Sequence, residues 1–121
     1  LLREHFSGWV PEVSQCFKRN PISLHIVADG EKVAGFAAYD TNNLGRSWFG
    51  PMGTNPAYRG KRIGRITLLR CLADQKRQGH TLSTIPWVGP VPFYWKQCGA
   101  RVSRAFWQMT KTLALPENGE E

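Results

Sequence analysis

Apolar residues recur at helical spacing in one long stretch of the chain, and this stretch predicts the main helix. The helix should run from about Gly64 to Gly79, because glycine favours a helix end and basic residues occupy the last turn. Its apolar positions, spaced mostly three and four apart, are Ile66, Leu68, Leu69, Leu72 and Ala73. This pattern predicts that one face packs on a sheet and that the other face is basic and solvated.

Three segments before this helix have the pattern of strands. Residues 22–28 alternate and are rich in β-formers, and Asp29-Gly30 predicts a hairpin turn into a returning strand, Val33–Tyr39. The next predicted strand, Arg46–Thr54, is interrupted by two glycines and a proline, which predict a bulge or a local loss of pairing.

The two ends of the chain complete the predicted order. Residues 1–20 carry an irregular helical pattern that the Asn20-Pro21 pair ends. After the long helix we expect a strand over 80–85, a short helix over 92–99 that Gly99 stops, and a final strand over Val102–Leu113.

Composition limits the class of protein. The chain of 121 residues suits a single domain, expected over residues 1–115, with an acidic and disordered tail over 116–121. The formal charge of +7 favours an anionic partner, such as nucleic acid, a phosphorylated cofactor or a lipid surface. The three cysteines are not clustered, so we expect no metal and a reduced, cytoplasmic protein. No apolar run is long enough for a membrane span.

A basic glycine loop leads into the long helix. Arg59-Gly60-Lys61-Arg62-Ile63-Gly64 holds two glycines and three cations. Free N–H groups and the positive end of the helix dipole favour a phosphate or pyrophosphate there. The alternative is an ordinary helix start with solvated cations, and the loop alone does not decide between the two.

The order of elements and two local motifs resemble the GNAT N-acetyltransferase superfamily. The segment from Asn55 to Gly64 is similar to the pyrophosphate loop of that family, Arg/Gln-x-x-Gly-x-Gly/Ala, with Arg62 at the first glycine position. Phe93-Tyr94, followed by Lys96 and Gly99, is similar to the family's Phe-Tyr-x-Lys-x-Gly segment. The resemblance covers roughly residues 22 to 112.

The resemblance implies an α/β (α+β) fold with a central, mostly antiparallel mixed sheet, a splayed strand pair and flanking helices. It also implies that the chain transfers an acetyl or other acyl group from acetyl-CoA to a primary amine, without a metal. The expected acyl-CoA contacts are Met52, Gly53, Thr54, Arg59, Gly60, Lys61, Arg62, Ile63, Gly64 and Arg65. The expected walls of the acceptor cleft are Trp9, Glu12 and Trp87.

The resemblance assigns the role of general acid to Tyr94, which would protonate the leaving thiolate. No carboxylate lies in Arg46–Thr54, so this strand does not supply the general base. Asp40, Glu12 and His25 are candidates for it, and a water relay is another.

The first strand and helix of the family, and its last strand, have no counterpart in the sequence pattern. We therefore expect a trimmed chain, a half of a tandem protein, or a homodimer or second GNAT-like domain that covers the sheet edge. Two other functions remain open: an acyl-CoA-binding or interaction module without catalysis, and a small basic RNA-binding domain. Neither a membrane nor nucleic acid is expected as the main partner.

Overall fold

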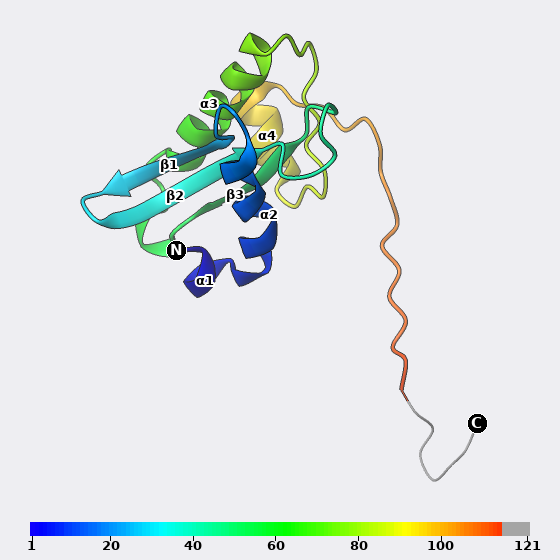
Figure 1. The fold of residues 1–121 in the computed structure, drawn as a ribbon. Helices are drawn as coiled ribbons and strands as arrows, with labels where there is room; N and C mark the ends of the chain where they lie inside the picture. Colours follow the sequence, from blue (N-terminus) through cyan, green and yellow to red (C-terminus); the bar gives the residue numbers. More distant parts are fainter. Residues whose placement is uncertain (115–121) are drawn as a thin grey trace.

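The fold is built on a three-stranded antiparallel sheet with helices on both faces (Figure 1). A computed structural model describes residues 1–114, so the acidic tail expected over 116–121 lies outside the described residues. The strands β1 (Leu24–Asp29), β2 (Lys32–Tyr39) and β3 (Phe49–Thr54) lie in the order β1-β2-β3. This arrangement confirms the predicted α/β fold class with flanking helices. No helix within residues 1–114 is long and apolar enough to cross a membrane.

The predicted hairpin joins β1 to β2. Asp29 pairs with Lys32, so the two loop residues are Gly30 and Glu31, one position later than the Asp29-Gly30 pair suggested. Gly30 has a φ of 60°, which a residue without a Cβ adopts at little cost. The hairpin therefore forms as the sequence predicted, with its turn shifted by one residue.

The long helix α3 (Ile63–Arg77) packs on one face of the sheet, opposite the N-terminal helices (Figure 1). The N-terminal segment forms four short pieces: α1 (Leu2–His5), η1 (Ser7–Trp9), α2 (Val10–Ser14) and η2 (Gln15–Lys18). The expected helix over residues 1–20 is thus broken, first at Phe6, whose φ of −140° is not helical. Phe6 stacks on Trp9 at 5.4 Å, and both rings meet Phe36 of β2 edge-on. Packing of aromatic rings on the sheet, rather than a regular helix, fixes this segment.

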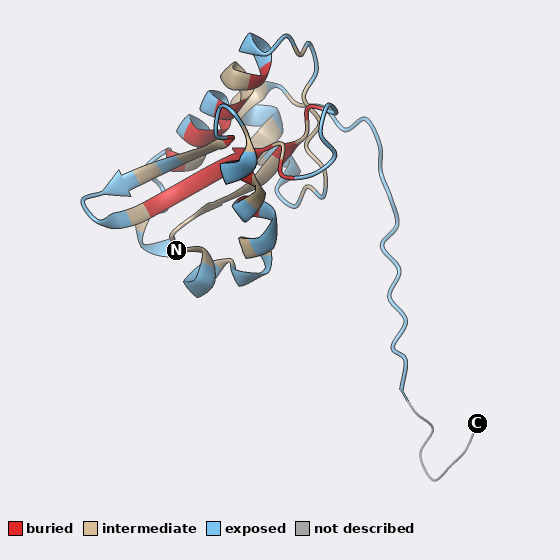
Figure 2. Ribbon diagram, in the orientation of Figure 1, coloured by how far each residue is buried: buried red, intermediate tan, exposed pale blue. Residues whose placement is uncertain are grey.

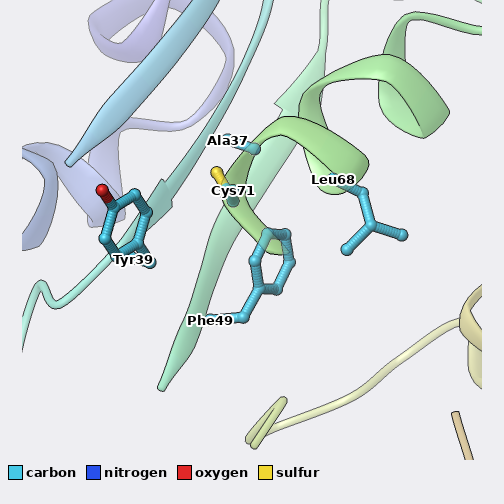
Figure 3. Close-up of a cluster of buried hydrophobic side chains, with 5 residues drawn as sticks. All are labelled: Ala37, Tyr39, Phe49, Leu68 and Cys71. Atoms are coloured by element: carbon cyan, nitrogen blue, oxygen red, sulfur yellow. The ribbon is translucent and has the colours of Figure 1, made fainter. Parts of the chain in front are cut away.

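The hydrophobic core lies between the sheet and α3. Its five buried members are Ala37, Tyr39, Phe49, Leu68 and Cys71 (Figure 3). Most of β2 is buried, as the red strand in Figure 2 shows, because it is the central strand and is covered on both faces.

The face of α3 that packs on the sheet differs from the predicted one. Ile66 and Leu69 are 49% and 38% exposed. The buried positions follow a spacing of mostly four and include two polar residues; they are Ile63, Thr67, Leu68, Cys71 and Gln75. Thr67 donates its hydroxyl hydrogen to the Ile63 carbonyl at 2.9 Å, and Ser83 donates to the Gln75 side chain at 2.7 Å. These hydrogen bonds lower the cost of burying Thr67 and the Gln75 oxygen, although the Gln75 Nε2 is buried without a partner among the described residues. Hydrophobicity alone therefore did not identify this face.

The strand expected over 80–85 is reduced to a single parallel bridge between Trp48 and Thr84. Similarly, β3 begins at Phe49 rather than at Arg46, because Ser47 has a φ of 57° that is incompatible with a strand. The short helix α4 (Val91–Cys98) forms as expected, and Gly99 ends it in the left-handed conformation, with a φ of 70°.

The predicted final strand, Val102–Leu113, is wrong. Residues 101–114 have no regular structure and run away from the body of the molecule (Figure 1). Phe106 and Trp107 are 83% and 93% exposed. Strand-forming residues are stabilised mainly by cross-strand neighbours, and this segment pairs with none of the described strands.

Candidate active site

A cleft of about 1160 Å³ opens between β3, the start of α3, the segment after Thr84 and α4. Its volume is slightly above the range of about 300–1,000 Å³ that is usual for small-molecule sites. The backbone walls of the cleft come from two segments, residues 49–54 and residues 85–90. The cleft is therefore formed where these two segments separate.

The two segments pair at one point only. The Phe49 N–H donates to the Thr84 carbonyl at 2.8 Å, and the Thr84 N–H donates to the Ser47 carbonyl at 3.0 Å. Beyond this bridge, no backbone hydrogen bond joins residues 49–54 to residues 85–90. The two segments therefore diverge, and only the first of them is a strand, whereas the resemblance implied a splayed pair of strands.

The outer edge of β3 presents backbone groups to the cleft. The Asn55 N–H donates to the Ala34 carbonyl at 2.7 Å, so residue 55 points its amide toward β2. Since amides alternate along a strand, Met52 and Thr54 point theirs toward the cleft. These two residues are a site where an extended ligand with amide groups can add as a further strand.

The start of α3 is an exposed positive helix end. Gly60 and Arg62 have φ values of 84° and 62°, and this tight loop turns the chain into the helix. No side chain within residues 1–114 caps the helix, and its first turn contains no acidic residue. The first N–H groups and the helix dipole are therefore available to an anion.

Two glycines let the loop approach the sheet closely. A Cβ at Gly35 of β2 would lie 2.5 Å from Ile63 Cγ2, and a Cβ at Gly64 would lie 3.2 Å from Met52 Cε. The helix start thus rests directly on β2 and β3. The close approach at Gly35 fixes the loop relative to the open edge of β3.

Tyr94 of α4 lies in the same cleft. Its ring packs edge-on against Phe49 at 6.1 Å and against Phe93 at 5.1 Å. Burial, with a smaller contribution from Cys98, raises the pKa of the Tyr94 phenol to about 12. At neutral pH the phenol keeps its proton and is a hydrogen-bond donor.

The structure brings most of the predicted site residues together. Those that line the cleft are Trp9, Glu12, Met52, Gly53, Thr54, Arg59, Gly60, Arg62, Ile63, Gly64, Arg65, Trp87 and Tyr94. Lys61 does not line it, and its ammonium group lies over the Tyr58 ring at 5.5 Å. Asp40 does not line it either, and its carbonyl accepts a hydrogen bond from Arg19 at 3.0 Å.

His25, a third base candidate, lies in a separate polar network. Its Nε2 is 2.6 Å from the Asp74 carboxylate, which also accepts a hydrogen bond from the Tyr39 hydroxyl at 3.1 Å. Burial and the nearby Asp74 raise the pKa of Tyr39 to about 12. This network joins α3 to β1 and β2 and does not line the cleft.

Sequence reasoning missed several polar and aromatic residues of the cleft, namely Thr41, Asn42, Trp48 and Gln97. The Thr41 hydroxyl donates to the Gly50 carbonyl at 3.3 Å, and the Asn42 amide donates to Glu12 at 3.5 Å. Thr41 and Asn42 lie in the turn-rich segment that follows β2, where only the fold shows which residues turn inward. Gln97 follows Tyr94 by three residues on α4, a spacing that signals a shared helix face.

The fold and the cleft define a class of protein: an α/β domain with a cleft that joins the edge of β3 to an uncapped, positive helix start. A family model described as acetyltransferase (GNAT) family matches residues 2–100. The chain belongs to this family, which supports an acyltransferase-type function, and the family typically uses acyl-CoA and an amine acceptor. No curated protein and no solved structure matches the chain. Within the described residues, no group of three or more His, Cys, Asp or Glu side chains could hold a metal ion.

Proposed function

We propose that the chain is an N-acetyltransferase that transfers the acetyl group of acetyl-CoA to a primary amine. The observation that carries this proposal is one continuous cleft that joins the uncapped start of α3, the open edge of β3 and the Tyr94 phenol. Each of the three parts matches one region of an acyl-CoA, in the order pyrophosphate, pantetheine arm and thioester.

The start of α3 binds the pyrophosphate in this proposal. The N–H groups of Ile63, Gly64 and Arg65 are without partners inside the helix, and Arg62 and Arg65 line the same part of the cleft. Backbone amides fix the position of the phosphates, and the guanidinium groups add charge-assisted hydrogen bonds.

The edge of β3 holds the pantetheine arm and polarises the thioester. The outward amides of Met52 and Thr54 pair with the amide groups of the arm, as a further strand would. One of these N–H groups also donates to the thioester carbonyl and stabilises the negative charge that develops on its oxygen. A neutral amine then attacks the carbonyl carbon; the C–N bond forms, the C–S bond breaks, and the products are an amide and the CoA thiol.

Tyr94 donates a hydrogen bond to the leaving sulfur. A phenol whose pKa is about 12 is a weaker acid than a thiol, whose usual pKa is about 8.5. The phenol thus stabilises the thiolate mainly by donating a hydrogen bond. The proton on the product CoA thiol is the one that the amine loses. We predict that Tyr94→Phe lowers turnover ~100- to 1,000-fold, the usual cost of losing one donor to a developing anion, while CoA affinity and thermal stability change little. If Tyr94→Phe kept full turnover, the role of Tyr94 would be packing and not hydrogen bonding to the leaving sulfur.

The proton of the amine leaves through water in this proposal. Glu12 is the only acidic residue, and no histidine is present, among the described residues that line the cleft. Asp40 directly precedes Thr41, which lines the cleft, so Asp40 is a candidate for the far end of such a relay. Asp40→Asn should then lower turnover without changing CoA affinity.

The binding test compares two substitutions at one position. Gly64→Ala and Gly64→Asp add the same Cβ beside Met52 and Phe93, and only the second adds a carboxylate at the helix start. We expect calorimetry to give a CoA affinity at least about tenfold weaker for Gly64→Asp than for Gly64→Ala, because the carboxylate repels the pyrophosphate. Equal affinities would contradict the loop assignment.

A binding module without catalysis is the second candidate. The small number of candidate general bases favours it, since Glu12 is the only acidic residue and no histidine is present among the described residues that line the cleft. The assay that separates the two candidates measures release of the CoA thiol with a panel of primary amines. CoA binding without thiol release from any amine would favour the module.

We also propose that a second copy of the chain covers an edge of the sheet. The strand β1 is the outer strand of the described sheet and pairs on one side only, with β2. Unpaired strand edges favour association with another strand. Sedimentation should therefore show a dimer, and a monomer whose β1 amides are fully protected from hydrogen exchange would contradict the proposal.

A further inference from the structure

The charges along the cleft are separated into two ends. Three cationic residues, Arg59, Arg62 and Arg65, line the end at the start of α3. Glu12 of α2 also lines the cleft and is the only acidic residue among its described lining residues. A cleft with cations at one end and a carboxylate at the other favours a pair of ligands with opposite charges.

Contacts place Glu12 at the end away from these arginines. Asn42 donates to the Glu12 carboxylate at 3.5 Å, and the neighbouring Thr41 donates to the carbonyl of Gly50 at 3.3 Å. Gly50 follows Phe49, the residue that packs against Tyr94. Glu12 is thus connected to the first residues of β3, where Tyr94 lies.

The other end of β3 lies next to the start of α3. Thr54, the last residue of β3, pairs with Gly35, and a Cβ at Gly35 would meet Ile63. The strand β3 therefore runs from the Glu12 end of the cleft to the arginine end, and the two charged ends are separated along it.

Three indole rings line the same cleft as the carboxylate. Trp9, Trp48 and Trp87 line the cleft, and Trp87 is 89% exposed with a φ of 54°, a conformation that is uncommon for a bulky residue. Indole faces attract organic cations, and their area also covers an alkyl chain. The exposure of such a large ring at the mouth of the cleft fits a residue that contacts a ligand.

We propose that the acceptor is a diamine: one amino group, as the neutral amine, attacks the thioester, and the second, as an ammonium group, binds Glu12 and the indoles. This proposal rests on the proposed function. The reacting amine must be uncharged, so a carboxylate that holds an ammonium group serves the second amine and not the first. Glu12 is then a residue that determines specificity and not the general base.

Three acceptors of similar length test the proposal. Butylamine, 1,4-diaminobutane and 4-aminobutyrate each present a primary amine at one end of a short chain and differ at the far end, which is neutral, positive or negative. We expect kcat/KM to be highest for the diamine and lowest for the amino acid. The ratio of diamine to butylamine should be about three- to tenfold, the range of a partly exposed ion pair aided by a cation–π contact.

The variant Glu12→Gln should bring the ratio of kcat/KM for the diamine to that for butylamine, counted per reactive amino group, to about one. The matched control, Glu31→Gln, changes the charge equally in the hairpin loop, away from the cleft, and should leave the ratio as in the wild type. If Glu12 were the general base, kcat/KM for both amines would fall together and the ratio would stay, which would overturn the proposal.

Equilibrium binding separates this proposal from the proposed function. In the presence of CoA, titration with 1,4-diaminobutane and with butylamine should show tighter binding of the diamine, and Glu12→Gln should remove the difference. Equal binding of the two amines to the wild type overturns the diamine assignment, even if acetyl transfer is observed. Tighter diamine binding without release of CoA thiol supports the acceptor site and contradicts the transferase reaction.

Discussion

Gly35 of β2 couples the sheet to the candidate CoA-binding loop, and Gly35→Ala tests that coupling. The new Cβ would lie 2.5 Å from Ile63 Cγ2 and 3.2 Å from the Gly53 carbonyl oxygen. Ordinary contacts of a Cβ lie at 3.4–4 Å, so the helix start must move by several tenths of an ångström or more. Ile63 is β-branched and its side chain has few alternative rotamers, so the backbone takes up part of the shift.

We expect Gly35→Ala to destabilise the fold by about 1–3 kcal/mol, the usual cost of overpacking. Urea unfolding should show a lower midpoint with an unchanged slope. The affinity for CoA should fall as well, because the displaced N–H groups of Ile63 and Gly64 no longer converge on the pyrophosphate. The control is Gly8→Ala, since a Cβ at Gly8 meets no atom within 4 Å.

A second substitution isolates the contact. Leucine at position 63 has a single γ carbon, so Ile63→Leu removes the methyl group that the new Cβ would meet. The double variant Gly35→Ala/Ile63→Leu should be more stable than the sum of the single changes predicts, with a coupling of about 0.5–3 kcal/mol. Additive effects, or a Gly35→Ala variant as stable as Gly8→Ala, would refute the close approach as the cause.

Three further predictions concern other parts of the fold. Arg62→Gly should raise the urea midpoint, with a gain of about 0.5–1 kcal/mol, because glycine adopts the φ of 62° with less strain; a loss would show that the side chain makes a native contact. The pKa of Tyr39 is raised from 10.0 to about 12, so its stability contribution is complete below pH 10 and is lost as the pH rises toward 12. Tyr39→Phe should therefore be less stable at neutral pH, but its stability should fall less between pH 10 and 12 in urea titrations; an unchanged slope would contradict this. Phe106→Ser and Trp107→Ser should each shift stability by less than about 0.5 kcal/mol, since both side chains are exposed, and a larger loss would mean that the segment packs in solution.

Interactions between residues close in the sequence determined much of the secondary structure of this protein. The hairpin, the helix Ile63–Arg77 and the end of α4 at Gly99 follow from glycine conformation and hydrophobic periodicity, which act within a few residues. The basic, glycine-containing start of α3 was predictable for the same reason, because its glycines, its cations and the helix dipole are neighbours in the chain. The Phe-Tyr pair, read as a family motif, also located Tyr94 in the cleft.

Only the tertiary structure decided the features that depend on a distant partner. Residues 102–113 have the composition of a strand, yet no described strand lies beside them, and pairing is a property of two segments. The buried face of α3 includes Thr67, which bonds to the Ile63 carbonyl, and Gln75, whose side-chain oxygen accepts a hydrogen bond from Ser83, and periodicity does not show either relation. In the same way, Glu12 and Asn42 are thirty residues apart, and only folding brings them into one cleft with Tyr94.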